Sequence, residues 1–177
     1  MLPPIQTERL LIRDFTEDDF DAVYAYSSDP EGVRYMAFPP STPEETHTYI
    51  GHCMRLALEE PRICYFMAVV RKATNQVIGG VRLGVMDWER GEGSFSYLFS
   101  RSAWGQGYAT EALRAMVRFG FEQLALNRLA DGCDVENIAS ARVMEKCGFR
   151  CEDERDGERF YALTRAEWQE MMQHETV

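Results

Sequence analysis

The spacing of apolar residues changes along the chain, and each change predicts a different element. Residues 7–13 (T-E-R-L-L-I-R) hold a short apolar run between charges, which predicts a strand. Residues 16–19 then place acidic side chains in the first turn of a helix. After the proline-rich loop 29–43, a second helix carries apolar residues at helical spacing. Both helices therefore present an apolar face to a core.

The middle of the chain follows a period of two. Residues 63–70 and 77–86 are separated by a short polar segment and predict an antiparallel hairpin. A third strand is expected at residues 94–100. The glycine-containing turn 105–107 then opens a helix with apolar positions at helical spacing, namely Leu113, Met116, Val117, Phe121 and Leu124.

The last third of the chain alternates strands with helices. Residues 128–135 predict a strand, and residues 137–147 predict a short helix. Residues 149–163 predict a hairpin that turns near Asp156 and Gly157, and a final helix begins near Thr164. Because strands come first as a meander and later flank helices, the expected fold class is α/β (α+β), a mixed sheet layered by helices in one domain over residues 1–177.

Composition and net charge limit the classes of molecule that the protein is expected to bind. Hydrophobic residues make up 45% of the 177, enough for a packed core without disulfides. The 29 acidic against 19 basic residues give a net charge of -10, which disfavours nucleic acid and anionic membranes and attracts a cationic amine. Five cysteines without a C-x-x-C pair, and no apolar run near the roughly 18 residues of a membrane span, predict a cytoplasmic protein with no membrane partner. The assembly is left open between a monomer and a homodimer.

The glycine turn is the strongest chemical signal. In W-G-Q-G-Y-A-T-E-A (104–112), a strand leads through Gly105 and Gly107 into a helix, where free backbone N–H groups and the helix dipole favour phosphate. A Walker loop is excluded because no G-K-[ST] follows. A dinucleotide fingerprint is disfavoured because Thr110 stands in place of the third glycine. A plain tight turn stays open on these nine residues alone.

Two ordered blocks carry a family resemblance. The turn, together with N-I-A-S-A-R-V-M-E-K-C-G-F (137–149), resembles the GNAT superfamily of N-acetyltransferases, and in particular its RimJ/RimL (ribosomal-protein alanine acetyltransferase) branch. Trp104 replaces the Gln or Arg that opens the loop in the superfamily, which is a form common in that branch. The segments 7–13 and 162–168 are also similar. The resemblance implies a mostly antiparallel sheet with a splayed central strand.

The resemblance also implies a donor site for acetyl-CoA as cosubstrate. The pyrophosphate is expected on the backbone N–H groups of Gly105, Gln106, Gly107, Tyr108, Ala109 and Thr110. The pantetheine arm is expected along the backbone of Leu98, Phe99 and Ser100. Asn137 has two interpretations, as the N-cap of its helix or as a contact to pantetheine or substrate.

The catalytic residues are less well defined. Many superfamily members have a Tyr seven residues after the Asn, but this chain has Met144 there. Ser140 lies one helical turn earlier, so we expect its hydroxyl to position the sulfur and donate the proton. The branch often has an acid where this chain has Ser94, and Glu92 shares that strand face. No general base is assigned, because Glu92 and two further candidates, Asp87 and Glu89, fit a solvated loop at least as well.

The remaining candidates have weaker signals. His47, His52 and His174 lack the spacing of a metal pair, so no metal is expected. Tyr35, Met36 and Phe38, in the long loop before the second helix, either wall an acceptor pocket or pack into the core. The acceptor itself is not identified by these residues.

The sequence therefore predicts an N-acetyltransferase that acts on a primary amine, either a protein N-terminus or a small molecule. Direct attack in a ternary complex is expected, because no cysteine lies in a motif that would lower its pKa for covalent catalysis. A catalytically weak acetyl-CoA-binding or sensing module is the alternative, since Met144 replaces the usual acid. An unrelated nucleotide-binding protein is a third and less favoured class.

Overall fold

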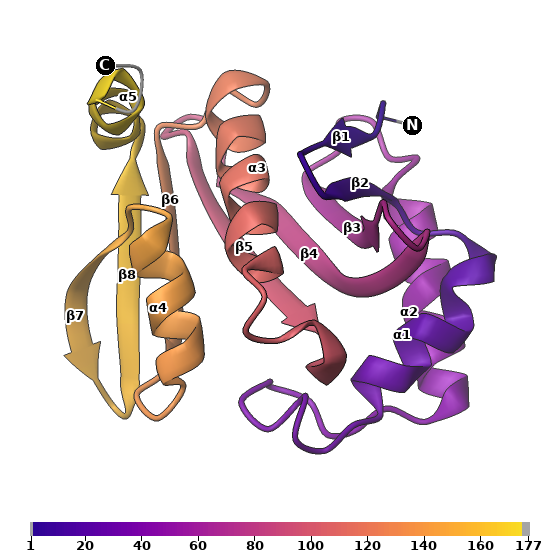
Figure 1. Ribbon diagram of the computed structural model, residues 1–177. Helices are drawn as coiled ribbons and strands as arrows, with labels where there is room; N and C mark the ends of the chain where they lie inside the picture. The colour runs from indigo at the N-terminus through magenta and orange to yellow at the C-terminus, as the bar shows by residue number, and fades with distance from the viewer. Residues whose placement is uncertain (1, 175–177) are drawn as a thin grey trace.

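One mixed sheet with helices on both faces forms the body of the molecule (Figure 1). The computed structural model describes residues 2–174. The sheet has eight strands in the order β1-β2-β3-β4-β5-β6-β8-β7. Their bounds are β1 Ile5–Gln6, β2 Leu10–Asp14, β3 Cys64–Arg71, β4 Gln76–Asp87, β5 Glu92–Phe99, β6 Arg128–Asp134, β7 Arg150–Arg155 and β8 Glu158–Thr164. The helices are η1 Glu17–Asp19, α1 Phe20–Ser27, α2 Pro43–Leu56, η2 Arg101–Ala103, α3 Tyr108–Glu122, α4 Ile138–Lys146 and α5 Arg165–His174.

The N-terminal segment differs from its prediction. A single strand over residues 7–13 was wrong, because Thr7 lies in a turn between β1 and β2. Its hydroxyl accepts the N–H of Leu10 at 2.9 Å, and its own N–H donates to the Leu10 carbonyl at 3.0 Å. Such a local side-chain bond competes with the strand ladder. The predicted hairpins β3–β4 and β7–β8 are confirmed.

Two apolar clusters of different size cover the two faces of the sheet. The larger lies under α3 and α4 and includes Met116, Leu83 and Leu129, all nearly inaccessible to solvent. The smaller lies under α1 and α2 and is built around Val23 and Ile50. Burial of these side chains stabilises the layers, since each apolar Å² removed from water contributes about 25 cal/mol.

The sheet opens in its centre. β5 and β6 are its one parallel pair, and their register covers only Glu92 with Arg128 and Gly93 with Leu129. Beyond these pairs the two strands diverge, whereas β4 and β5 stay paired up to Gly79 and Phe99. The predicted mixed, mostly antiparallel sheet with a splayed central strand is therefore confirmed. Within residues 2–174, no helix has both the length and the apolar character needed to cross a bilayer.

Candidate active site

The splay leaves one edge of β5 open. Ser100 donates its N–H to the Ile78 carbonyl at 2.9 Å, so even-numbered residues of β5 turn their peptide groups toward β4. Odd-numbered residues turn theirs toward the opening, where the N–H of Phe95 donates to Asp131 Oδ2 at 3.0 Å. The peptide of Tyr97 lies on this edge, beyond the last pair of the β5–β6 ladder. An extended ligand can therefore add here as a strand.

The three residues expected to hold pantetheine do not all turn their peptide groups toward the opening. Phe99 faces the opening, and its carbonyl accepts the indole N–H of Trp104 at 2.9 Å. Leu98 is paired with Gly80 and Ser100 is bonded to β4, so both direct their peptide groups away from the opening. The edge groups within reach of a ligand thus belong to Tyr97 and Phe99.

The Asp131 side chain lies between β5 and β6, just beyond the last paired residues of the two strands. Asp131 was not identified from the sequence. Its Oδ1 accepts the N–H of Gly132 at 2.9 Å while Oδ2 takes that of Phe95. Burial raises the pKa of this carboxyl, although the two peptide hydrogen bonds act to lower it. The available signal was the period of two: Asp131 shares the inward face of β6 with Leu129 and Cys133.

The glycine turn 105–107 and the start of α3 have the backbone geometry that can bind an anion, and they are called the cradle below. Gly105 and Gly107 have φ of 71° and 81°, which disfavours side chains larger than hydrogen. Gly107 is the N-cap of α3 and no side chain caps the helix. The first helical bond runs from the Glu111 N–H to the Gly107 carbonyl at 3.0 Å, so the N–H groups of residues 108–110 have no acceptor within the helix. Three donors and the positive end of the dipole therefore meet at one place.

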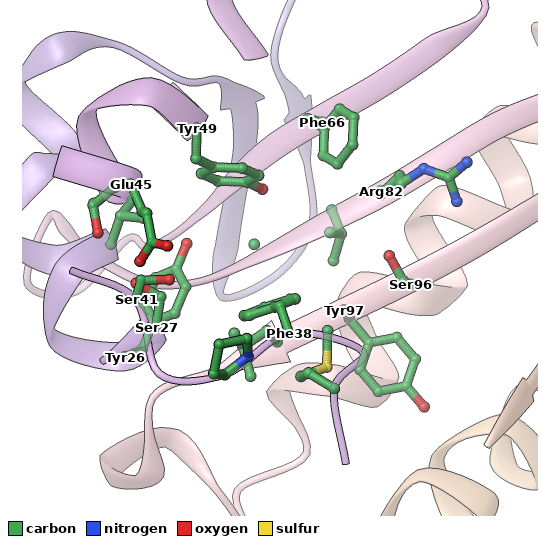
Figure 2. A pocket seen from close by; sticks show the side chains of 17 residues that line it. Tyr26, Ser27, Phe38, Ser41, Glu45, Tyr49, Phe66, Arg82, Ser96 and Tyr97 are labelled. Atoms are coloured by element: carbon green, nitrogen blue, oxygen red, sulfur yellow. The ribbon is translucent and has the colours of Figure 1, made fainter. Parts of the chain in front are cut away.

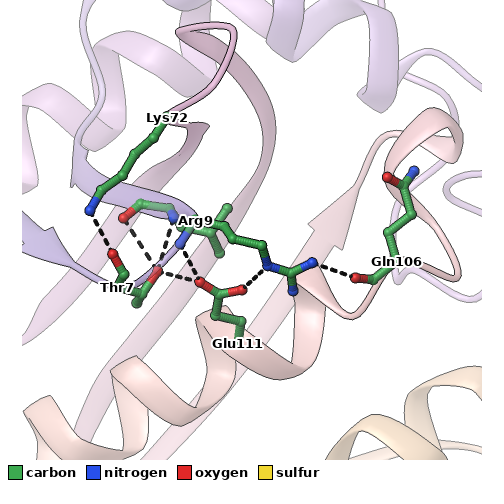
Figure 3. Close-up of polar contacts among 6 residues, drawn as sticks. Thr7, Arg9, Lys72, Gln106 and Glu111 are labelled. Carbon is green, nitrogen blue, oxygen red and sulfur yellow. Dashed lines mark hydrogen bonds and ion pairs between the residues drawn. The ribbon is translucent and has the colours of Figure 1, made fainter.

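A polar network ties this turn to the N-terminal strands (Figure 3). Glu111 accepts from Thr7 Oγ1 at 2.6 Å, from the Arg9 N–H at 2.9 Å and from Arg9 Nε at 2.6 Å. Arg9 also donates to the Gln106 carbonyl at 2.9 Å, and Lys72 donates to the Thr7 carbonyl. Burial acts to raise the pKa of Glu111, but these hydrogen bonds outweigh it and hold the pKa below its usual value. Arg9 thus places a guanidinium beside the cradle.

Ser140 on α4 and Tyr97 on β5 bring two hydroxyl groups together beside the splay. Asn137 Oδ1 accepts the N–H of Ser140 at 3.1 Å, so the predicted N-cap is present. Ser140 Oγ lies 2.9 Å from the Tyr97 hydroxyl. Burial raises the pKa of Tyr97, against the lowering effect of its bond to Ser140, so the phenol keeps its proton. Met144 is 1% exposed and packs in the core.

The thiols and the potential metal ligands are dispersed. All five cysteines are free, and burial raises the pKa of both Cys53 and Cys147 to about 12. A thiol with such a pKa is a poor nucleophile at neutral pH. In the part of the chain from residue 2 to 174, no three His, Cys, Asp or Glu side chains form a group that could hold a metal ion.

An apolar pocket of about 450 Å³ lies on the α1–α2 side of β5 (Figure 2). Of the three residues for which pocket lining and core packing were both open, Met36 and Phe38 line the pocket, whereas Tyr35 lies outside it and donates to the Glu136 carbonyl at 3.4 Å. The lining comes from α1, α2, the loop between them and three strands: Val23, Tyr26, Ser27, Met36, Phe38, Pro39, Ser41, Glu45, Thr46, Tyr49, Phe66, Gly80, Val81, Arg82, Ser96, Tyr97 and Leu98. Its size is typical of small-molecule sites, which span about 300–1,000 Å³.

The three acids considered as bases do not line this pocket. Glu92 begins β5 and is paired with Arg128, and Asp87 ends β4 and accepts the N–H of Arg90 from the following loop at 3.0 Å. Glu89 is exposed in that loop. Ser94 receives a hydrogen bond from Arg82 at 3.1 Å. Among residues 2–174, Asp131 and Tyr97 are ionisable groups beside the splay, and Arg82 lines the pocket.

This arrangement can accommodate two ligands, an extended anionic one along β5 and a second, largely apolar one in the pocket across that strand. The family model described as an acetyltransferase (GNAT) domain matches residues 9–150. The chain belongs to this family and is an acetyltransferase, an enzyme class whose acetyl donor is acetyl-CoA.

Individual relatives agree with this placement. An N-acetyltransferase of Bacillus licheniformis, p20, is 32% identical over 149 residues, which cover 84% of this chain and 83% of that protein. The FsC-acetyl coenzyme A-N(2)-transacetylase of Aspergillus fumigatus is 30% identical, over 96% of this chain and 79% of its own. The crystal structure of a GNAT-family acetyltransferase from Bacillus anthracis superposes with a TM-score of 0.80 at 28% identity, over 92% of this chain and 98% of that one.

Proposed function

We propose that this protein transfers the acetyl group of acetyl-CoA to a primary amine by direct attack in a ternary complex. The observation that carries the proposal is the open edge of β5 beside an uncapped helix N-terminus. Both features supply backbone hydrogen-bonding groups, one set for an extended arm and the other for a pyrophosphate. The pocket on the other side of the strand gives an amine access to the same edge.

The donor is held mainly by backbone groups. The N–H groups from Gly105 to Thr110 bind the pyrophosphate, and the Arg9 guanidinium adds a cation beside it. The pantetheine arm runs along the opening and pairs with the peptide groups of Tyr97 and Phe99. Asn137 acts as a helix cap that fixes the position of Ser140.

The reaction moves one acetyl group and one proton. The amine nitrogen forms a bond to the acetyl carbon, the carbon–sulfur bond breaks, the amine loses a proton and the thiol gains one. Ser140 supplies or relays the proton to sulfur, and the Tyr97 hydroxyl, 2.9 Å away, holds the Ser140 side chain in place. Covalent transfer through a cysteine is disfavoured by the high pKa of the buried thiols Cys53 and Cys147.

The assignment to a branch of the family is based on two blocks of sequence. We place the chain in the RimJ/RimL-like branch on the turn at 104–112 and the block 137–149. The acceptor is a protein N-terminus or a small amine, and the pocket volume of about 450 Å³ fits the small amine. Transfer to an amine nitrogen is what the name of the Aspergillus relative describes for that protein.

The turn allows a test with a closely matched control. Gly107→Asp puts a carboxylate where the phosphate would lie, and CoA affinity should fall on the order of 100-fold or more. Gly157→Asp makes the same change at the same φ of 81°, in the β7–β8 turn. Gly157→Asp should leave CoA affinity within about twofold of wild type, because it introduces the same backbone strain as Gly107→Asp but outside the proposed donor site. Both affinities are measured by calorimetry on folded protein.

Equal CoA affinity in the two folded variants would overturn the donor site. Steady-state release of free CoA with a panel of amines separates an enzyme from a binding module. Release that depends on the amine supports transfer. Tight CoA binding with no release for any amine would favour the binding module.

A further inference from the structure

Arg82 is a guanidinium in the acceptor pocket with no carboxylate to neutralise it. It is half-buried on β4, and it donates to Ser94 Oγ at 3.1 Å. Its guanidinium carbon lies 5.8 Å from the centre of the Phe66 ring. Among residues 2–174 it takes part in no ion pair. The positive charge of Arg82 acts to lower the pKa of Asp131, but the two side chains form no ion pair, and the Asp131 carboxylate accepts peptide N–H groups.

The position of Arg82 relates it to the reacting amine. Arg82 is the cross-strand partner of Ser96, and Ser96 and Tyr97 line the pocket where it reaches the open edge of β5. Figure 2 shows Glu45 at one end of the pocket and Arg82 at the opposite end, beside Phe66 and Ser96. A chemical group of the acceptor that contacts Arg82 is therefore attached close to the reacting amine of that acceptor. Glu45 lies near the other end of the acceptor.

Aromatic walls enclose the space between these ends. Tyr49 and Phe66 pack edge to face with ring centres 5.9 Å apart, and Phe38 lies across the pocket from them. Rings of this kind bind an apolar or aromatic body by area and by stacking. The pocket thus combines one cation near the reaction site with an apolar interior.

We infer that the acceptor is an apolar or aromatic α-amino acid, whose carboxylate binds Arg82 and whose side chain fills the aromatic part of the pocket. This inference rests on the proposed N-acetyltransferase function. The guanidinium bonds to Ser94, two residues before Ser96 on the same face of β5, so a carboxylate held by Arg82 leaves the adjacent amine near Ser96. The guanidinium can bind it through two parallel hydrogen bonds, and in a partly desolvated pocket such a pair is favourable. A polyamine has no anion to offer and is repelled by the same charge.

Matched acceptors isolate the carboxylate. L-Phenylalanine, L-phenylalaninamide and 2-phenylethylamine share the ring and the amine and differ at the position facing Arg82. The wild-type kcat/KM should be highest for phenylalanine, and about 10- to 100-fold lower for the two compounds without a carboxylate. Arg82→Gln should remove this preference by lowering the phenylalanine rate alone, and Arg82→Lys should retain part of it. Arg118→Gln, an exposed change of the same kind on α3, should leave all three rates unchanged.

A binding measurement separates this inference from the proposed function. Calorimetry in the presence of CoA compares N-acetyl-L-phenylalanine with N-acetyl-2-phenylethylamine, and it requires no turnover. Arg82-dependent preference for the carboxylate supports the inference even if no amine is acetylated, a result that would refute the function. Turnover of phenylethylamine as fast as phenylalanine, or an equal loss of both in Arg82→Gln with Arg82→Lys no better, would overturn the inference and leave the function standing.

Discussion

Glu111→Gln tests whether the network beneath the glycine turn stabilises the fold through charge. Glutamine keeps the shape of the side chain and one carbonyl oxygen, which can still accept from Thr7 Oγ1 and the Arg9 N–H. Its amide nitrogen, however, faces Arg9 Nε, so the bond that measures 2.6 Å in the native protein becomes a contact between two donors. The substitution therefore removes one ion pair and weakens two hydrogen bonds.

The expected loss follows from the exposure of the partners. The Arg9 side chain is 42% exposed, so its ion pair with Glu111 contributes only about 0.5–1 kcal/mol after screening. The two remaining bonds change from a charged to a neutral acceptor, which costs about 1 kcal/mol each. Glu111→Gln should lower the free energy of unfolding by about 2.5–3 kcal/mol, equivalent to about 5–12 °C in Tm for a chain of this size.

Urea denaturation at a series of pH values is the assay, with Glu122→Gln in the same helix as the control. Glu122 is half-exposed and lies 4.0 Å from Arg118, so its substitution should change stability by no more than about 0.5 kcal/mol. The folded-state pKa of Glu111 is depressed, so its contribution is fully present above the unfolded value of 4.5. The difference between wild type and Glu111→Gln should be constant from neutral pH to about 5.5 and shrink as the pH falls through the folded-state pKa.

Two results would refute this reasoning. A loss no larger than that of Glu122→Gln would show that the Glu111 bonds are offset by the cost of burying the carboxylate. A large loss that stays the same at acid pH would show that shape, and not charge, holds the turn.

Further predictions concern the splay. Ser140→Ala should lower kcat well beyond tenfold with CoA affinity nearly unchanged, because general acid catalysis contributes about 10²- to 10⁴-fold. Tyr97→Phe should cost less, since Tyr97 only holds Ser140, and a drop of a few-fold for Ser140→Ala would leave that residue a packing role. Replacing all five cysteines by Ser or Ala should leave activity in any folded variant, and mass spectrometry that traps an acetyl-enzyme would argue against direct transfer. Asp131→Asn should lower the free energy of unfolding in urea by about 1–3 kcal/mol, because the two peptide donors bond to different carboxylate oxygens and one of them would face the amide NH₂, and unchanged stability would contradict that role.

Local patterns were enough to predict most elements. Period-two alternation predicted β3 and β4, and glycine spacing predicted both the turn and the start of α3. The β1–β2 turn escaped because Thr7 bonds to Leu10 through a side chain, in a run whose composition is typical of a strand. The position of β8 between β6 and β7 also depends on pairing between distant segments, which periodicity does not encode.

The candidate site also has features that follow from the local sequence and features that depend on contacts between distant residues. The cradle could be predicted because its donors are consecutive in the chain. The bond between Glu111 and Thr7 could not be predicted, since the two residues lie 104 positions apart in the chain. The role of Asp131 depends on the divergence of β5 from β6, and that of Arg82 depends on the pocket that α1 and α2 form over the paired strands β4 and β5. Neither arrangement is encoded in the local sequence.

The open edge of β5 also bears on how such an enzyme can diversify. If the donor is read by peptide groups and glycine conformation, its recognition survives most substitutions of the surrounding side chains. The acceptor pocket, in contrast, is formed by side chains, many of them from α1, α2 and the loop that joins them. Substitutions there can change the amine that is accepted while the donor stays bound in the same way. One strand thus separates a part of the molecule under strong backbone constraint from a part that is free to acquire new specificity.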